Sequence, residues 1–67
     1  MEYGKYYVVD VEFFKGNWRH KAIFYYDGKP YESDIGTLYS KGYESPKDVR
    51  IENLHYFNVI SEIKDMN

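Results

Sequence analysis

The chain has 67 residues, no cysteine and a formal net charge of −2. A chain of this length supplies one modest hydrophobic core, so we expect a single compact domain over residues 1–67. Without cysteine there are no disulfides or thiolate metal sites, and self-association or a partner would have to add stability instead. The nearly balanced charge favours neither a strongly basic nucleic-acid binder nor an acidic mimic of DNA.

No targeting or membrane-spanning segment is evident. The N-terminal residues lack a basic region followed by an apolar stretch, and no apolar run approaches the length of a transmembrane helix. We therefore expect a soluble, cytoplasmic protein.

The first part of the chain predicts a β-hairpin. Residues 6–14 are dense in β-branched and aromatic side chains, and apolar residues alternate along them as on a half-buried strand. The alternating positions are Tyr7, Val9, Val11 and Phe13. Residues 15–17 contain the Gly and Asn of a tight turn, and residues 18–26 then form a second strand of matching length.

A second turn and a third strand are predicted next. Asp27 and Gly28 are a strong turn signal, and residues 29–33 can return as a brief strand. Pro30 cannot donate a backbone hydrogen bond, so this strand belongs on a sheet edge. The three strands would form an antiparallel meander.

Residues 34–41 are predicted to form a short helix. Ser33 is a suitable N-cap, and Gly42 is a suitable residue just beyond the last turn. Apolar side chains follow the helical spacing i, i+3 and i+4 at Ile35, Leu38 and Tyr39. Gly36 weakens this helix by about 1 kcal/mol relative to alanine.

The C-terminal third supports two interpretations. Ser45 followed by Pro46 can begin a helix, which could extend to about residue 63. The β-branched and aromatic residues of this region favour a strand instead. We favour one helical turn after Ser45 and then a strand over residues 53–64, with the longer helix as the alternative.

The expected fold class is therefore α+β. A small twisted antiparallel sheet of three to four strands would carry one short helix on one face. The expected core residues are Tyr7, Val9, Val11, Phe13, Ala22, Phe24, Ile35, Leu38, Val59 and Ile63.

Four pairs of adjacent aromatic residues distinguish this chain: Tyr6-Tyr7, Phe13-Phe14, Tyr25-Tyr26 and Tyr56-Phe57. Neighbouring side chains on a strand point to opposite faces, so each pair would place one ring on each side of the sheet. One short helix can cover only one face, which leaves the second aromatic face for a partner or for a second copy. The simpler interpretation is that these residues only favour strands, with tyrosine hydroxyls in water.

The predicted second strand is locally basic. Arg19 and Lys21 would alternate onto the same face as Tyr25, a mixture of cations and rings typical of surfaces that bind single-stranded nucleic acid. The same two cations could instead face Asp10 and Glu12 across the hairpin.

Evidence for catalysis is weak. Glu12, Arg19 and His20 could serve as the acid, base and cation of a metal-independent ribonuclease, but they lack a diagnostic spacing. His20 and His55 lack metal-ligand spacing, and there is no glycine-rich phosphate loop. We therefore expect that the protein is not an enzyme and that it binds no cofactor or metal.

The sequence favours a small non-enzymatic protein-binding module, an inhibitor or modulator of a larger protein that could also form a homodimer. Its profile resembles that of the small accessory proteins with which phages and mobile elements bind host proteins. A sheet that binds single-stranded nucleic acid is the alternative, and a ribonuclease is a more remote one. The expected contact residues are Tyr6, Phe14, Trp18, Arg19, Lys21, Tyr25, Tyr26 and Tyr31.

Overall fold

A computed structural model describes residues 1–28, 34–39 and 46–64. These residues form five strands and one short 3-10 turn. In chain order the elements are β1 (Tyr6–Glu12), β2 (Trp18–Tyr25), β3 (Ile35–Tyr39), β4 (Lys47–Arg50), η1 (Ile51–Asn53) and β5 (Tyr56–Ile63). No helix in this part of the chain is long and apolar enough to cross a membrane.

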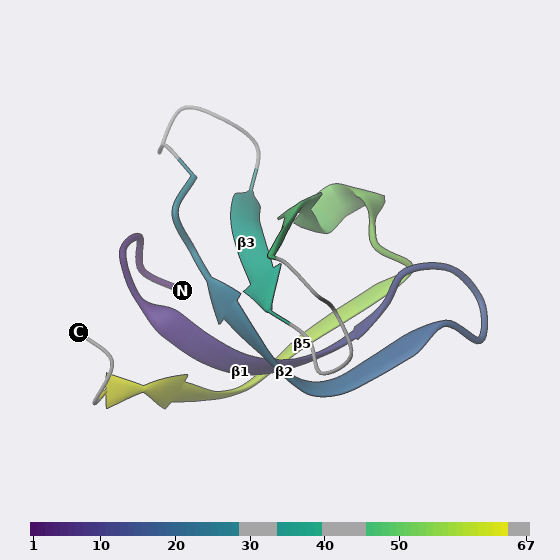
Figure 1. The fold of residues 1–67 in the computed structure, drawn as a ribbon, viewed down its shortest axis with the longest axis horizontal. Coiled ribbons are helices and arrows are strands. Elements are labelled where there is room, and N and C mark those ends of the chain that lie inside the picture. The colour runs from purple at the N-terminus through teal and green to yellow at the C-terminus, as the bar shows by residue number, and fades with distance from the viewer. Residues whose placement is uncertain (29–33, 40–45, 65–67) are drawn as a thin grey trace.

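All five strands belong to one antiparallel sheet in the order β4-β3-β2-β1-β5. The first four strands follow one another as a meander, and β5 returns to pair with β1 (Figure 1). Among the described residues, β4 and β5 are thus the two edge strands.

The predicted α+β fold class is wrong, because the sheet has five strands and the described residues contain no α-helix. Strand β3 lies where the helix was predicted. Its Gly36 pairs with Val49 of β4, and a Cβ at Gly36 would overlap the Phe24 ring of β2. Strand β3 pairs with β2 on one side and with β4 on the other, and it approaches Phe24 closely. These contacts override an apolar spacing that also suited a helix.

The strand predicted over residues 53–64 is confirmed, although β5 begins only at Tyr56. The helical turn predicted after Ser45 is wrong, because Lys47–Arg50 forms β4 and the turn follows at Ile51–Asn53. The longer helix is wrong for the same reason. The strand predicted over residues 29–33 and the proposed caps Ser33 and Gly42 lie outside the described residues.

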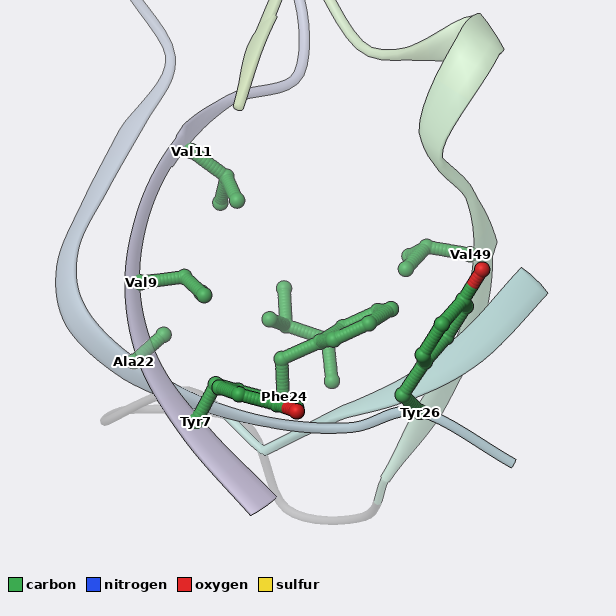
Figure 2. Close-up of a cluster of buried hydrophobic side chains, with 8 residues drawn as sticks. Tyr7, Val9, Val11, Ala22, Phe24, Tyr26 and Val49 are labelled. Atoms are coloured by element: carbon green, nitrogen blue, oxygen red, sulfur yellow. The ribbon is translucent and has the colours of Figure 1, made fainter. Parts of the chain in front are cut away.

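The core lies on one face of the sheet, which curls around it (Figure 2). Its buried residues are Tyr7, Val9, Val11, Ala22, Phe24, Tyr26, Leu38 and Val49. Phe24 is fully enclosed and meets the Phe57 ring edge-on, at 5.2 Å between centroids. The half-buried side chains of Phe13, Ile51, Leu54 and Phe57 pack against this cluster.

Most of the predicted core is confirmed, with three exceptions. Val59 is exposed at the edge strand β5. Ile63 pairs with Tyr6 and therefore lies on the opposite face from the core. Ile35, half-buried, alternates with the core-facing Gly36 and lies on that same opposite face.

An irregularity in β2 changes which face its basic residues occupy. Val9 pairs with Ala22 and Val11 pairs with Arg19, so β2 holds one more residue than β1 between these pairs. This β2 bulge places Arg19 opposite a core residue, with its guanidinium carbon 5.7 Å from the centroid of the Phe13 ring. The prediction that Arg19 shares the face of Tyr25 is therefore wrong, because simple alternation fails across the bulge.

Candidate functional site

The face of the sheet opposite the core, here called the outer face, carries a patch of apolar side chains. Alternation and register place these residues together on four neighbouring strands. The members of this apolar patch are Tyr6, Val8, Ile23, Tyr25, Tyr39 and Ile63. All of the described strands lie within the sheet, and η1 packs toward the core, so no described element lies over the patch.

A stacked pair of tyrosines lies at the centre of the patch. Tyr6 of β1 is directly opposite Tyr25 of β2, and their ring centroids are 4.3 Å apart with an interplanar angle of 19°. Each ring shields part of the other, and both are half-buried although no other described element covers them. Such a cross-strand aromatic pair holds both rings in a fixed orientation.

A second aromatic group, here called the Trp18 cluster, extends the outer face toward the β1–β2 turn. Trp18 stacks on His20 at 5.3 Å between centroids and lies 5.3 Å from the Tyr56 ring in a tilted contact. Trp18 and Tyr56 flank Glu12 from either side, on β2 and β5 respectively. Both rings are exposed.

Two carboxylates between these aromatic groups accept hydrogen bonds from backbone amides. Asp10 Oδ1 accepts a hydrogen bond of 2.9 Å from the amide of Lys21 in the β2 bulge, and His20 Nδ1 lies 3.6 Å from the same oxygen. Glu12 is only 7% exposed. Its carboxylate accepts a hydrogen bond of 2.7 Å from the Gly16 amide and lies 3.6 Å from Nε2 of His55.

Further acidic side chains lie beside the patch on its β3 side. The Thr37 hydroxyl donates to Asp27 at 2.9 Å and lies 3.4 Å from an oxygen of Asp48. Thr37 pairs with Tyr25, so these carboxylates lie next to the stacked tyrosines. Among the described residues, Asp10, Asp27 and Asp48 therefore lie around the patch.

The predicted contact residues occupy several different places. Tyr6, Trp18 and Tyr25 lie on the outer face. Phe14 is 64% exposed but lies in the turn after β1 rather than on the sheet. Lys21 is exposed in the β2 bulge, and Tyr31 lies outside the described residues.

Tyr26 is not a surface residue. Its ring is buried, stacks on Tyr3 at 4.3 Å and contacts Phe24. Its hydroxyl donates a hydrogen bond of 2.6 Å to Asp34. This bond to the Asp34 carboxylate, a hydrogen bond with Tyr3 and burial together raise the pKa of Tyr26. Tyr26 therefore does not form part of the candidate site.

Four apolar residues of the outer face were not predicted there. Tyr39 was assigned to a helix, Ile35 and Ile63 were assigned to the core, and Tyr56 was not selected among the contact residues. The pair Tyr56-Phe57 did contain a usable signal, because one of its two rings had to point away from the core. The positions of Tyr39 and Ile63 depend on the strand pairings and carried no such signal.

The three residues considered for ribonuclease chemistry have separate structural partners. Glu12 faces Gly16 and His55, whereas His20 faces Asp10. Arg19 donates a 2.8 Å hydrogen bond to the Trp18 carbonyl and lies over Phe13. In the described part of the chain, no group of three or more acidic, histidine or cysteine side chains could hold a metal ion.

Compared with protein-family models, with curated protein sequences and with solved structures, the chain matches none. The candidate site is therefore defined by the geometry of this chain alone.

Proposed function

We propose that this protein is a non-enzymatic protein-binding module that holds a larger protein on the outer face of its sheet and modulates it. The stacked pair Tyr6–Tyr25 in the centre of the apolar patch is the observation on which this rests. A rigid pair of rings that no described element covers presents a large contact area and loses little side-chain entropy on binding.

The surroundings of the patch define the chemistry of the partner. Rings of the Trp18 cluster extend the contact area, and Asp10, Asp27 and Asp48 make its margin acidic. A complementary protein surface would present apolar side chains flanked by lysine or arginine.

The same distribution favours a protein over single-stranded nucleic acid. A nucleic-acid platform needs cations beside its stacking rings, since phosphates supply most of the binding free energy. Arg19 lies on the opposite face, and the carboxylates beside the tyrosines would repel phosphates.

Affinity capture from the source cells with variants of the protein tests this proposal. Tyr25→Ala removes half of the stacked pair and should weaken capture of the partner by about 1 kcal/mol or more, as aromatic hot spots do. Asn53→Ala is the control, because it changes an exposed side chain of η1, which packs toward the core side of the sheet. Quantitative mass spectrometry of the captured proteins compares both variants with the wild type.

Two results would contradict the proposal. One is a set of captured proteins that Tyr25→Ala and Tyr6→Ala leave unchanged while both variants remain folded by circular dichroism. The other is salt-sensitive binding of fluorescently labelled single-stranded DNA or RNA in an anisotropy titration, which would restore the nucleic-acid alternative.

A further inference from the structure

The two edges of the sheet differ in how well they are protected against pairing with another chain. Strand β4 has four residues, of which Lys47, Asp48 and Arg50 are charged. Short, charged edge strands resist further pairing. Strand β5 has eight residues, no proline and a single charged residue, Glu62. It is the unprotected edge.

Apolar side chains are exposed along β5. Val59 and Ile60, in the middle of the strand, are 38% and 47% exposed, and Tyr56 at its start is also exposed. Among the described residues β5 pairs only with β1, so its other side presents backbone groups without a strand partner (Figure 1). An apolar strand with an open side is a template for adding a further strand.

An extra residue in β5 determines which side chains share a face. Val8 pairs with Ser61 and Val9 with Val59, so Ile60 is inserted between the two pairs. Before and after this insertion, the residues on the outer face are Tyr56, Asn58, Ser61 and Ile63. Those on the core side are Phe57, Val59 and Glu62.

We propose that two copies of this chain pair through β5, antiparallel and about a two-fold axis, with Val59 of each copy opposite Ile60 of the other. In such a pair, residues directly opposite one another must lie on the same face of the sheet. The proposed register satisfies this condition at the three pairs that lie on either side of the central Val59 and Ile60. It pairs Tyr56 with Ile63, Phe57 with Glu62, and Asn58 with Ser61 of the second copy.

The insertion at Ile60 is what permits this register. In a strand without an insertion, side chains on the same face are an even number of positions apart. Residues that pair across a two-fold axis must therefore also be separated by an even number of positions. Here both copies carry the inserted residue at the same place. Two residues on opposite sides of the insertion therefore share a face when they are separated by an odd number of positions. A shift by one position would place core-side residues opposite outer-face residues along the strand.

The pairing is also chemically consistent. It joins polar Asn58 to polar Ser61, buries the exposed Val59 and Ile60 against each other, and keeps the two copies of Glu62 apart. The result is one continuous sheet with five strands from each copy, which leaves both apolar patches accessible. Because an edge-strand contact is small, we expect dissociation in about the micromolar range.

Oligomeric state measured against concentration tests the dimer. Sedimentation velocity from about 1 to about 200 µM should show a monomer–dimer equilibrium, as mass action requires. Ile60→Lys places a charge at the centre of the contact and should shift the equilibrium to monomer by at least about tenfold in dissociation constant. Asn53→Lys, at an exposed position in η1, adds the same charge outside β5 and should leave the equilibrium unchanged.

Cysteine cross-linking tests the register, since the chain has no cysteine of its own. A mixture of Asn58→Cys and Ser61→Cys proteins should form a disulfide-linked heterodimer on mild oxidation. Neither variant alone should cross-link efficiently.

The proposal would be overturned by a monomer over the whole concentration range, or by a dimer that Ile60→Lys does not weaken although the variant is folded by circular dichroism. Stronger cross-linking within a single variant than in the mixture would exclude the proposed register. None of these results bears on the foreign partner of the outer face, which the Tyr25→Ala capture experiment tests separately.

Discussion

The Tyr26 side chain contacts the core with its ring and the Asp34 carboxylate with its hydroxyl. Its buried ring contacts Phe24 and Tyr3, and its hydroxyl donates to the carboxylate of Asp34. That carboxylate stabilises the protonated phenol, so the pKa of Tyr26 in the folded protein is higher than the value of about 10 expected in the unfolded chain. The folded protein therefore retains this proton at a pH where the unfolded chain loses it.

This difference predicts a loss of stability in alkaline solution. Below about pH 10 both states hold the Tyr26 proton, and its contribution is fully present. As the pH rises above that value, the unfolded state releases the proton first, so the free energy of unfolding falls. Tyr26→Phe should remove this part of the pH dependence and should cost about 1 kcal/mol at neutral pH through the lost hydrogen bond.

Urea denaturation between about pH 8 and about pH 11, followed by tryptophan fluorescence, measures the effect. The other tyrosines are common to both proteins, so the difference between the two pH profiles isolates Tyr26. Parallel profiles for wild type and variant would contradict the prediction.

At the scale of single elements, the β2 bulge determines the distribution of charge over the sheet. Lys21 has φ of 54°, a left-handed conformation that non-glycine residues rarely adopt. The Asp10 carboxylate stabilises it by accepting the Lys21 amide hydrogen bond. A local backbone conformation thus turns Arg19 toward the core side of the sheet.

Lys21→Gly should therefore stabilise the protein, by about 1 kcal/mol, because glycine adopts positive φ without the steric penalty of a Cβ. Lys21→Ala is the control, since it removes the same side chain and keeps the penalty. Urea denaturation at neutral pH compares the two with the wild type. A Lys21→Gly protein no more stable than Lys21→Ala would show that position 21 is not strained.

At the scale of the whole molecule, the sheet curls around one small core, and Gly36 is a point of close approach within it. An added Cβ would overlap the Phe24 ring and lie 2.6 Å from the carbonyl oxygen of Tyr25. Phe24 is fully enclosed at the centre of the core, so neither neighbour can move without disturbing several strands.

Gly36→Ala should accordingly destabilise the protein by about 3 kcal/mol, a large share of the stability of a domain of this size. Gly16→Ala is the control. Gly16 has φ of 87° and no atom within 4 Å of an added Cβ, so alanine there should cost only about 1 kcal/mol of conformational strain. Equal losses for the two variants in thermal and urea denaturation would contradict this account of the core.

The two proposed surfaces have different centres and meet at β5, where Ile63 belongs to both. The apolar patch is centred on β1 and β2, whereas self-pairing uses the free edge of β5. A dimer would place two patches in one continuous sheet, and a target with two matching surfaces would then bind with avidity. The Tyr25→Ala and Ile60→Lys variants separate these two contributions experimentally.

Alternation in the sequence determined the first hairpin and most of the core. The strands predicted over residues 6–14 and 18–26 are observed as Tyr6–Glu12 and Trp18–Tyr25, because β-branched and aromatic residues at period two can bury only one face of a strand. The adjacent aromatic pairs likewise indicated rings on both sides of the sheet, as the positions of Tyr6 and Tyr7 show.

Only the tertiary structure decided the rest, because contacts between distant residues override local patterns. The apolar spacing of residues 34–41 suited a helix, and pairing of β3 with β2 and β4 around Phe24 made it a strand. The faces of Arg19 and Ile63 depend on register, and one inserted residue in a strand reverses the alternation beyond it. Local composition thus determined which segments could be strands, whereas long-range pairing determined the sheet they form and the residues on its outer face.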